Sequence, residues 1–575
     1  MKRSPPSAWF LSRRRLLGLF SVAGGGLLAP GSAAFAQTAQ SWESAAVIDA
    51  PVPEVRLGLD AAARANAVAF LDRIGWGASA GQLRDLARLG ATGYLDAQLR
   101  AHASPNLPPE LATQLAALPV NQPLEALIPP IVRQERAFRL ARKNNPQADA
   151  ADTEAQLKAL NKFKYALSQQ AAAQQVLLGI YAANPLQQRL SWFWLNHFNV
   201  FRNGAIGPMM GDYAQRVIAP HALGTFRELL RATMFSPQML LYLNNAQNAR
   251  GHVNENYARE VMELHTLGVG SGYSQADVTN LARVLTGLGV DLLDKPVRAR
   301  PALRAEVWKQ GLVVFNPARH DSDPKSVLGH TLQGNGLDEI EAVISLLADH
   351  PATARHVSTQ LAQYFVSDRP LPGLVDGMVQ RWQASGGDIA AVLRTMFTSP
   401  QFSASLRQSQ FKDPMRYVLS ALRVSVGDAL IRNPQPVLGM LNRLGEPLYG
   451  RQTPDGYPLN TGAWDSPGQL AARFEVARQI GLGAPALFGA QPEFLRQNAP
   501  LEVADADGMQ RGMNAAPAQT REPLPHRPPP DLSQSAVYLA QQDQLSINTL
   551  RALAQADNRV RWNALWLSSP EFMNA

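Results

Sequence analysis

Residues 254–287 read NENYAREVMELHTLGVGSGYSQADVTNLARVLTG and predict two helices joined by a glycine turn. Asn254 is placed to cap the first helix. Gly268 follows the last periodic residue and fits a left-handed helix end. Ser274 and Asp277 have the spacing of a capping box, which predicts the start of the second helix.

The first of these helices combines a charged stripe with an otherwise apolar surface. Glu255, Arg259 and Glu263 are four residues apart, so they predict a ladder of ion pairs. Glu260 lies on a neighbouring stripe. Apolar side chains spread around the rest of the helix: Tyr257, Ala258, Val261, Met262, Leu264 and Leu267. A helix apolar on all sides is usually buried. We therefore expect a buried polar centre, with Glu260 and Glu263 shielded from water and at least one of them in contact with an arginine or histidine of another segment.

The same stretch resembles the signature of an exported bacterial family catalogued as domain of unknown function 1800. Four other blocks carry the resemblance: FLDRIGWGAS at 70–79, FWLNHFNV at 193–200, RHDSDPKSVLG at 319–329 and HPATARHVSTQLAQYFV at 350–366. The resemblance covers most of the mature chain and brings no established activity. It implies a possible partner, because family members commonly neighbour genes for a second twin-arginine-exported protein that resembles sulfatases.

Residues 1–36 have the features of a twin-arginine signal peptide. Arg13 and Arg14 precede an apolar, glycine-rich run at 16–28, and Ala34-Phe35-Ala36 offers a cleavage site. The run is short for a membrane span, and no second run of membrane length follows. We expect a periplasmic or secreted protein, with a linker at 37–60 and no stable membrane span after cleavage.

Charge and cysteine content narrow the function classes. The chain has 54 basic and 46 acidic residues, and five of the basic residues lie in the signal, so 49 basic residues remain in the mature chain. No clustered basic stripe of the kind that nucleic-acid binding needs is present. The absence of cysteine excludes disulfides, thiolate metal sites and a cysteine nucleophile.

Helical periodicity continues through most of the remaining chain. It predicts a mainly α fold, one large multi-helical domain at 61–575, with a minor β-hairpin and long irregular loops. The hairpin is expected within 304–317, and 497–534 has the composition of a flexible insertion. Ser-Pro pairs at 236, 399 and 569 predict helix restarts.

Two sets of side chains are candidates for chemistry. His197, Glu260, Glu263 and His265 are candidate ligands of a divalent metal. The catalytic candidates are Glu260, Glu263, His320 and Asp321. His197 lies among aromatic residues, where a lone histidine is more often part of the core.

The favoured interpretation of these charges is a structural network. Glu255, Arg259 and Arg283 are its expected members, with Arg227 as a further cation. Two function classes remain open. One is a non-catalytic scaffold or accessory protein for another exported protein, which this network favours. The other is a metal-assisted hydrolase acting on envelope or extracellular polymers.

Overall fold

The computed structural model describes residues 61–100, 105–144, 150–334, 336–496 and 527–575. The predicted signal at 1–36, the linker at 37–60 and most of the predicted insertion at 497–534 lie outside them. The described residues are mostly helical, with two small antiparallel sheets, so the predicted mainly α class is confirmed. Their buried apolar side chains form one continuous core.

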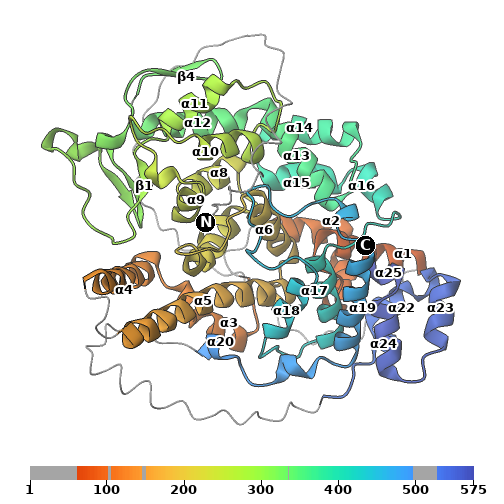
Figure 1. The fold of residues 1–575 in the computed structure, drawn as a ribbon. Coiled ribbons are helices and arrows are strands. Elements are labelled where there is room, and N and C mark those ends of the chain that lie inside the picture. Colours follow the sequence, from red (N-terminus) through yellow and green to blue (C-terminus); the bar gives the residue numbers. More distant parts are fainter. Residues whose placement is uncertain (1–60, 101–104, 145–149, 335, 497–526) are drawn as a thin grey trace, which may run out of the picture.

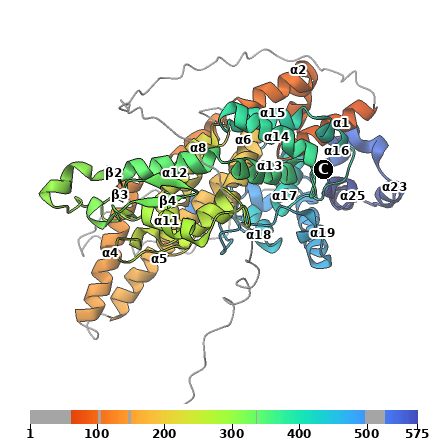
Figure 2. The same cartoon turned by 90° about the horizontal axis from the view of Figure 1, so that it is seen from above.

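The first six helices run from the start of the described chain to the aromatic stretch. They are α1 (Ala61–Ile74), α2 (Ala80–Leu99), α3 (Pro109–Ala116), α4 (Leu124–Asn144), α5 (Ala150–Tyr181) and α6 (Pro185–His197). The paired helices α4 and α5 project at one end of an elongated molecule (Figures 1 and 2). Almost every residue of helix α6 is buried, so this helix lies inside the core.

Shorter helices follow, and two of them, α7 and α10, continue into π-helical segments, at Tyr213–Ile218 and Val261–His265. The α-helices are α7 (Met210–Asp212), α8 (Phe226–Met234), α9 (Pro237–Tyr242), α10 (Asn256–Glu260) and α11 (Gln275–Val284). Helix α10 continues directly into the π-helical turn Val261–His265. The first helix predicted from the sequence is therefore α-helical over Asn256–Glu260 and π-helical over Val261–His265.

Two antiparallel sheets interrupt the helices. In the first, β3 (Val313–Phe315) lies between β1 (Leu288–Val290) and β2 (Trp308–Gln310), and β2 with β3 forms the predicted hairpin. The second sheet pairs β4 (Lys325–Val327) with β5 (His330–Leu332). This second hairpin was not predicted from the sequence, which indicated a single minor hairpin within 304–317.

Helices then continue to the end of the chain. They are α12 (Leu337–Asp349), α13 (Pro351–Phe365), α14 (Pro372–Ser385), α15 (Ile389–Phe397), α16 (Pro400–Ser405), α17 (Pro414–Val426), α18 (Gln435–Arg443), α19 (Pro467–Gly481), α20 (Glu493–Arg496), α22 (Ala536–Gln541), α23 (Ile547–Ala554), α24 (Arg559–Leu567) and α25 (Pro570–Met573). Helix α13 packs against α14, and α14 against α15, beside the buried α6 (Figure 1).

The three predicted Ser-Pro restarts are confirmed. Ser236, Ser399 and Ser569 each cap a helix by accepting a hydrogen bond from a backbone N–H, and proline occupies the first turn in each case. The pattern is local, because the cap and the proline act on their own helix. Its recurrence shows a repeated way of joining helices.

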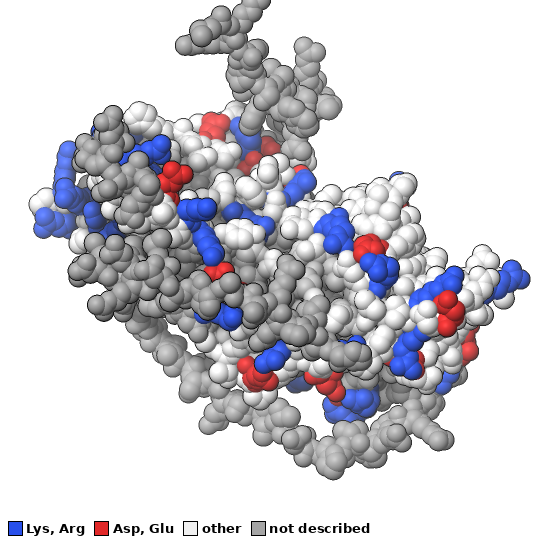
Figure 3. Space-filling view, turned by 60° about the horizontal axis from the view of Figure 1, so that its bottom comes forward, with Lys and Arg blue, Asp and Glu red and all other residues white. Residues whose placement is uncertain are grey.

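The surface carries both signs of charge. On the face in Figure 3, basic and acidic side chains form small, separate groups with uncharged surface between them. None of the helices in the described part of the chain combines the length and the apolar character needed to cross a bilayer.

Candidate functional site

Helix α10, the first helix of the stretch 254–287, begins one residue later than the sequence indicated. Glu255, not Asn254, occupies the N-cap position of α10. The side-chain oxygen of Asn254 accepts a hydrogen bond from the Asn256 N–H at 3.0 Å, so Asn254 shapes the turn before the helix. The predicted capping box of Ser274 and Asp277 is confirmed at the start of α11.

The predicted ion-pair ladder forms, but at the surface. Arg259 lies 3.2 Å from Glu255 and 3.5 Å from Glu263, and these side chains are 35%, 35% and 21% exposed. Glu260 and Glu263 are half-buried, so the prediction that both are shielded from water is wrong. The arginine that pairs with Glu263 also belongs to α10 itself and not to another segment.

Two histidine side chains lie within hydrogen-bond distance of backbone carbonyl oxygens in the π-helical turn. His197 Nε2 lies 3.0 Å from the His265 carbonyl oxygen, and His356 Nε2 lies 3.2 Å from that of Leu264. A helix leaves its last carbonyls without partners inside the helix. The two histidines supply those partners from α6 and α13, and so they attach the π-helical turn to both helices.

Gly268 ends this turn and is required for two reasons. Its φ is +86°, in the left-handed region, as predicted from the sequence. A Cβ atom at this position would also lie 2.8 Å from His356 Nδ1. A side chain at residue 268 would therefore strain the backbone and displace the histidine.

His197, His265 and His356 form a histidine cluster of neutral rings. Burial and the neighbouring His356 lower the pKa of His197 to about 4. Burial also lowers the pKa of His265, well below its ordinary value, and that of His356. His197 Nδ1 lies 2.7 Å from Gln360 Oε1, and since a neutral ring that donates through Nε2 must accept at Nδ1, both bonds form only when the Gln360 amide presents its nitrogen to Nδ1.

The structure does not assemble the predicted metal ligands. The rings of His197 and His265 are neighbours, with centroids 6.2 Å apart, whereas Glu260, at the end of α10, and Glu263, in the π-helical turn, are half-buried. Within the described ranges, no three histidine, aspartate or glutamate residues are grouped so that they could hold a metal ion. His197 is instead the core histidine that its aromatic surroundings indicated.

The two catalytic candidates of the 319–329 segment belong to a separate buried network. Glu339 Oε1 lies 2.9 Å from His320 Nε2 and 2.7 Å from Lys325 Nζ. Asp321 Oδ2 lies 2.8 Å from Arg283 Nε. Glu339 was not a candidate from the sequence. The burial of Lys325 was also not predicted, because Lys325 lies in a segment rich in charged residues.

The expected structural network is therefore divided among separate sites. Glu255 and Arg259 belong to the surface ladder, and Arg283 belongs to the pair with Asp321. Arg227 forms a third, exposed pair with Asp349 at 2.6 Å. No single polar centre joins these charges in the described residues.

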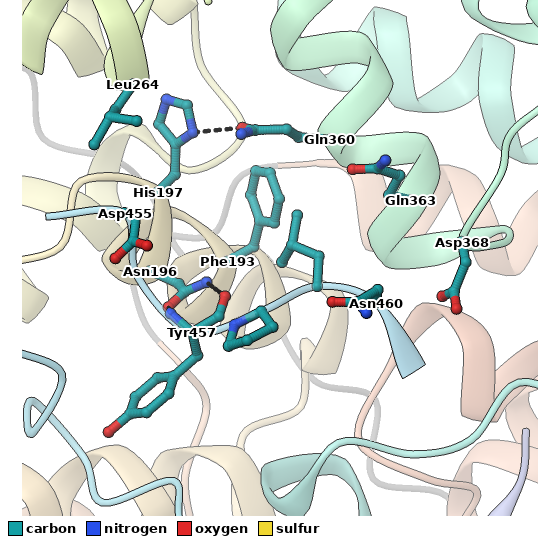
Figure 4. Close-up of a pocket in the computed structure, with 12 residues that line it drawn as sticks. Phe193, Asn196, His197, Leu264, Gln360, Gln363, Asp368, Asp455, Tyr457 and Asn460 are labelled. Atoms are coloured by element: carbon teal, nitrogen blue, oxygen red, sulfur yellow. Dashed lines mark hydrogen bonds between the residues drawn. The ribbon is translucent and has the colours of Figure 1, made fainter. Parts of the chain in front are cut away.

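A pocket of about 280 Å³ opens beside the histidine cluster (Figure 4). The end of α6, the π-helical turn, α13 and the segment 455–460 form its walls. The polar residues of its lining are Asn196, His197, Gln360, Gln363, Asp368, Asp455, Tyr457 and Asn460. The volume lies near the lower end of the range of small-molecule sites, roughly 300–1,000 Å³.

Two residues fasten the segment 455–460 to the helices. The Asn196 amide donates to the Tyr457 carbonyl at 2.9 Å and accepts from the Tyr457 N–H at 2.6 Å (Figure 4). Asp368 accepts hydrogen bonds from the backbone N–H and the hydroxyl of Thr461. Gly456 permits this approach, because a Cβ atom there would overlap the Asn196 carbonyl oxygen.

The comparison with protein families covers almost all of the described chain. A family model described as "Protein of unknown function (DUF1800)" matches residues 69–574. The chain belongs to this family. No curated protein and no solved structure matches it.

Three of the stretches that carry the resemblance to DUF1800 meet at this pocket. The block 193–200 supplies Asn196 and His197, the block 350–366 supplies Gln360 and Gln363, and the signature stretch supplies Leu264. The lining residues other than His197 were not candidates from the sequence. The available signal was the set of amide side chains within otherwise apolar helices, and it is a weak one, because amides also serve as helix caps and structural bonds.

Proposed function

We propose that this DUF1800 protein is a non-catalytic binding protein whose ligand site is the pocket between α6, α13 and residues 455–460. The supporting observation is a pocket in which the acid and base groups have protein partners, while among the described residues none bonds the side-chain amides of Gln363 and Asn460. Small-molecule sites are usually preformed cavities with a few placed polar groups. An accessory role for a second exported protein remains part of the proposal and rests on the family resemblance alone.

Each ionisable side chain of the pocket is already bonded to another group of the protein. Asp455 pairs with Arg451 at 3.1 Å and accepts from the Thr453 hydroxyl. Asp368 is bonded to Thr461, and His197 has partners at both ring nitrogens. A general acid or base needs a hydrogen bond to its substrate, directly or through one water. These groups instead hold the walls of the pocket in place.

Ligand retention tests the binding function. The mature protein and a Gln363→Trp variant, whose added ring fills the pocket, are incubated with small-molecule extracts of envelope and culture medium. After gel filtration and denaturation, mass spectrometry identifies what each protein retained. We expect a compound that is enriched on the mature protein, absent from the Gln363→Trp variant and recovered with unchanged mass.

Gln380→Trp is the matched control, because Gln380 is an exposed glutamine on α14 outside the pocket. This variant should retain the same compound as the unmodified protein. Equal retention by Gln363→Trp would refute the pocket as the site. Recovery of shortened or hydrolysed products that depend on the protein would favour the hydrolase instead.

Export through the twin-arginine route is the second part of the proposed function. Its support is the Arg13-Arg14 pair before the apolar run 16–28, followed by Ala34-Phe35-Ala36. Changing both arginines to lysine should keep the chain in the cytoplasm with its signal uncleaved, as measured by fractionation and by the N-terminal mass. Normal periplasmic appearance of the double variant would contradict this route.

A further inference from the structure

The pocket offers uncommitted amides on two of its walls. Gln363 on α13 and Asn460 on the opposite segment both line it. Within the described residues, no protein group bonds either side-chain amide. Each amide can donate and accept, so together they match a ligand whose groups do both.

The charges of the pocket disfavour an anionic ligand. Its lining contains two carboxylates, Asp368 and Asp455, and no lysine or arginine. The carboxylates lie on opposite sides of the pocket (Figure 4). A phosphate, sulfate or carboxylate of a ligand would therefore find no lysine or arginine in the lining to pair with, and the carboxylate of Asp368 would repel it.

A strongly cationic ligand is also poorly matched. Asp455 is neutralised by Arg451, whose guanidinium contacts both carboxylate oxygens at 3.1 and 3.2 Å. Asp368 is occupied by Thr461 but keeps lone pairs, since a carboxylate has about four acceptor positions. These oxygens are suited to accept from hydroxyl groups.

Apolar groups line the remaining surface. Leu264, Pro458 and Leu459 contribute side chains, together with the edge of the buried Phe193. A ligand that fits must present hydroxyl groups in some directions and carbon–hydrogen surface in others. Sugar rings have this combination, because their hydroxyls lie around the rim and their C–H groups form faces.

Building on the binding function proposed above, we propose that the pocket binds a neutral saccharide unit of a glycan. The hydroxyl groups bond to the amides of Gln363 and Asn460 and to the free lone pairs of Asp368. The C–H face of the ring lies on Leu264 and Leu459. The ligand class is thus set by uncharged hydrogen-bonding groups and an apolar wall.

Titration with defined sugars tests this ligand class. The mature protein is titrated by calorimetry with neutral, N-acetylated, free-amine and uronic-acid oligosaccharides of matched length. We expect a neutral or N-acetylated oligosaccharide to bind more tightly than the free-amine and acidic ones. Gln363→Leu and Asn460→Leu should each weaken that binding by about tenfold, the loss expected for one hydrogen bond. Gln380→Leu on α14 should leave the affinity unchanged.

Two results would overturn the assignment. One is tighter binding of the free-amine or acidic oligosaccharides. The other is no sugar binding by a protein that still retains an extract compound in a Gln363-dependent manner, which would refute the ligand class and leave the binding function intact. If Gln363→Trp and the unmodified protein retain the same compounds, the binding function itself fails.

Discussion

Replacing Lys325 by methionine should lower the free energy of unfolding by about 3–5 kcal/mol. Lys325 Nζ lies 2.7 Å from Glu339 Oε1, and the two side chains are only 0% and 2% exposed. Methionine keeps an apolar stem of similar shape but leaves the buried carboxylate of Glu339 with one cation fewer. Urea unfolding followed by tryptophan fluorescence measures the loss.

The exposed pair of Arg355 and Asp376 is the matched control. Its nitrogen–oxygen distance is also 2.7 Å, but its side chains are 56% and 50% exposed. Arg355→Met should therefore change the free energy of unfolding by less than about 1 kcal/mol. Equal losses in Lys325→Met and Arg355→Met would show that burial of the Lys325–Glu339 pair does not determine its contribution.

Acid should destabilise the protein through the histidine cluster. Burial, with His356 nearby, lowers the pKa of His197 from its ordinary 6.5 to about 4, and burial lowers the pKa of His265 and of His356. The unfolded chain thus binds protons at a pH at which the folded chain does not. Stability from these rings is complete above pH 6.5 and falls as the pH approaches 4. His197 alone accounts for roughly 3 kcal/mol of that loss at pH 4.

The free energies of unfolding of two variants separate the contribution of His197 from that of the other titrating groups. Between pH 6.5 and 4, His197→Gln should show a shallower fall than the unmodified protein, whereas His252→Gln, which changes an exposed histidine, should not. Burial raises the pKa of Glu446, so this residue acts in the opposite direction and favours the folded state at low pH. Its contribution is common to all three proteins. Parallel curves for His197→Gln and the unmodified protein would contradict the role of His197.

Features set by neighbouring residues could be predicted from the sequence. The capping box of Ser274 and Asp277 and the Ser-Pro restarts need only a few consecutive residues, because caps bond to their own helix. Gly268 was recognised in the same way as a left-handed helix end. The mainly α fold class follows from the sum of such local signals.

The site depended on information that periodicity does not contain. The prediction for Glu263 assumed a regular α-helix, whereas the chain adopts a wider π-helical turn from Val261, which changes the direction of every later side chain. The partner of His320 and Lys325 is Glu339, which lies farther along the chain on α12. The pocket could not be predicted either, because its walls come from segments far apart in the chain.

The hydrogen bonds between Tyr457 and Asn196 determine at which stage of folding the pocket can form. These residues are 261 positions apart in the chain, and His197 and Gln360 are 163 apart. Contacts of such long range form late, because closing a large loop has an entropic cost that nearby contacts do not have. Most of the chain must therefore have emerged from the ribosome before the site can form. Nascent chains that stop before residue 457 lack one wall, so binding competence should appear only after residues 455–460 have left the ribosome.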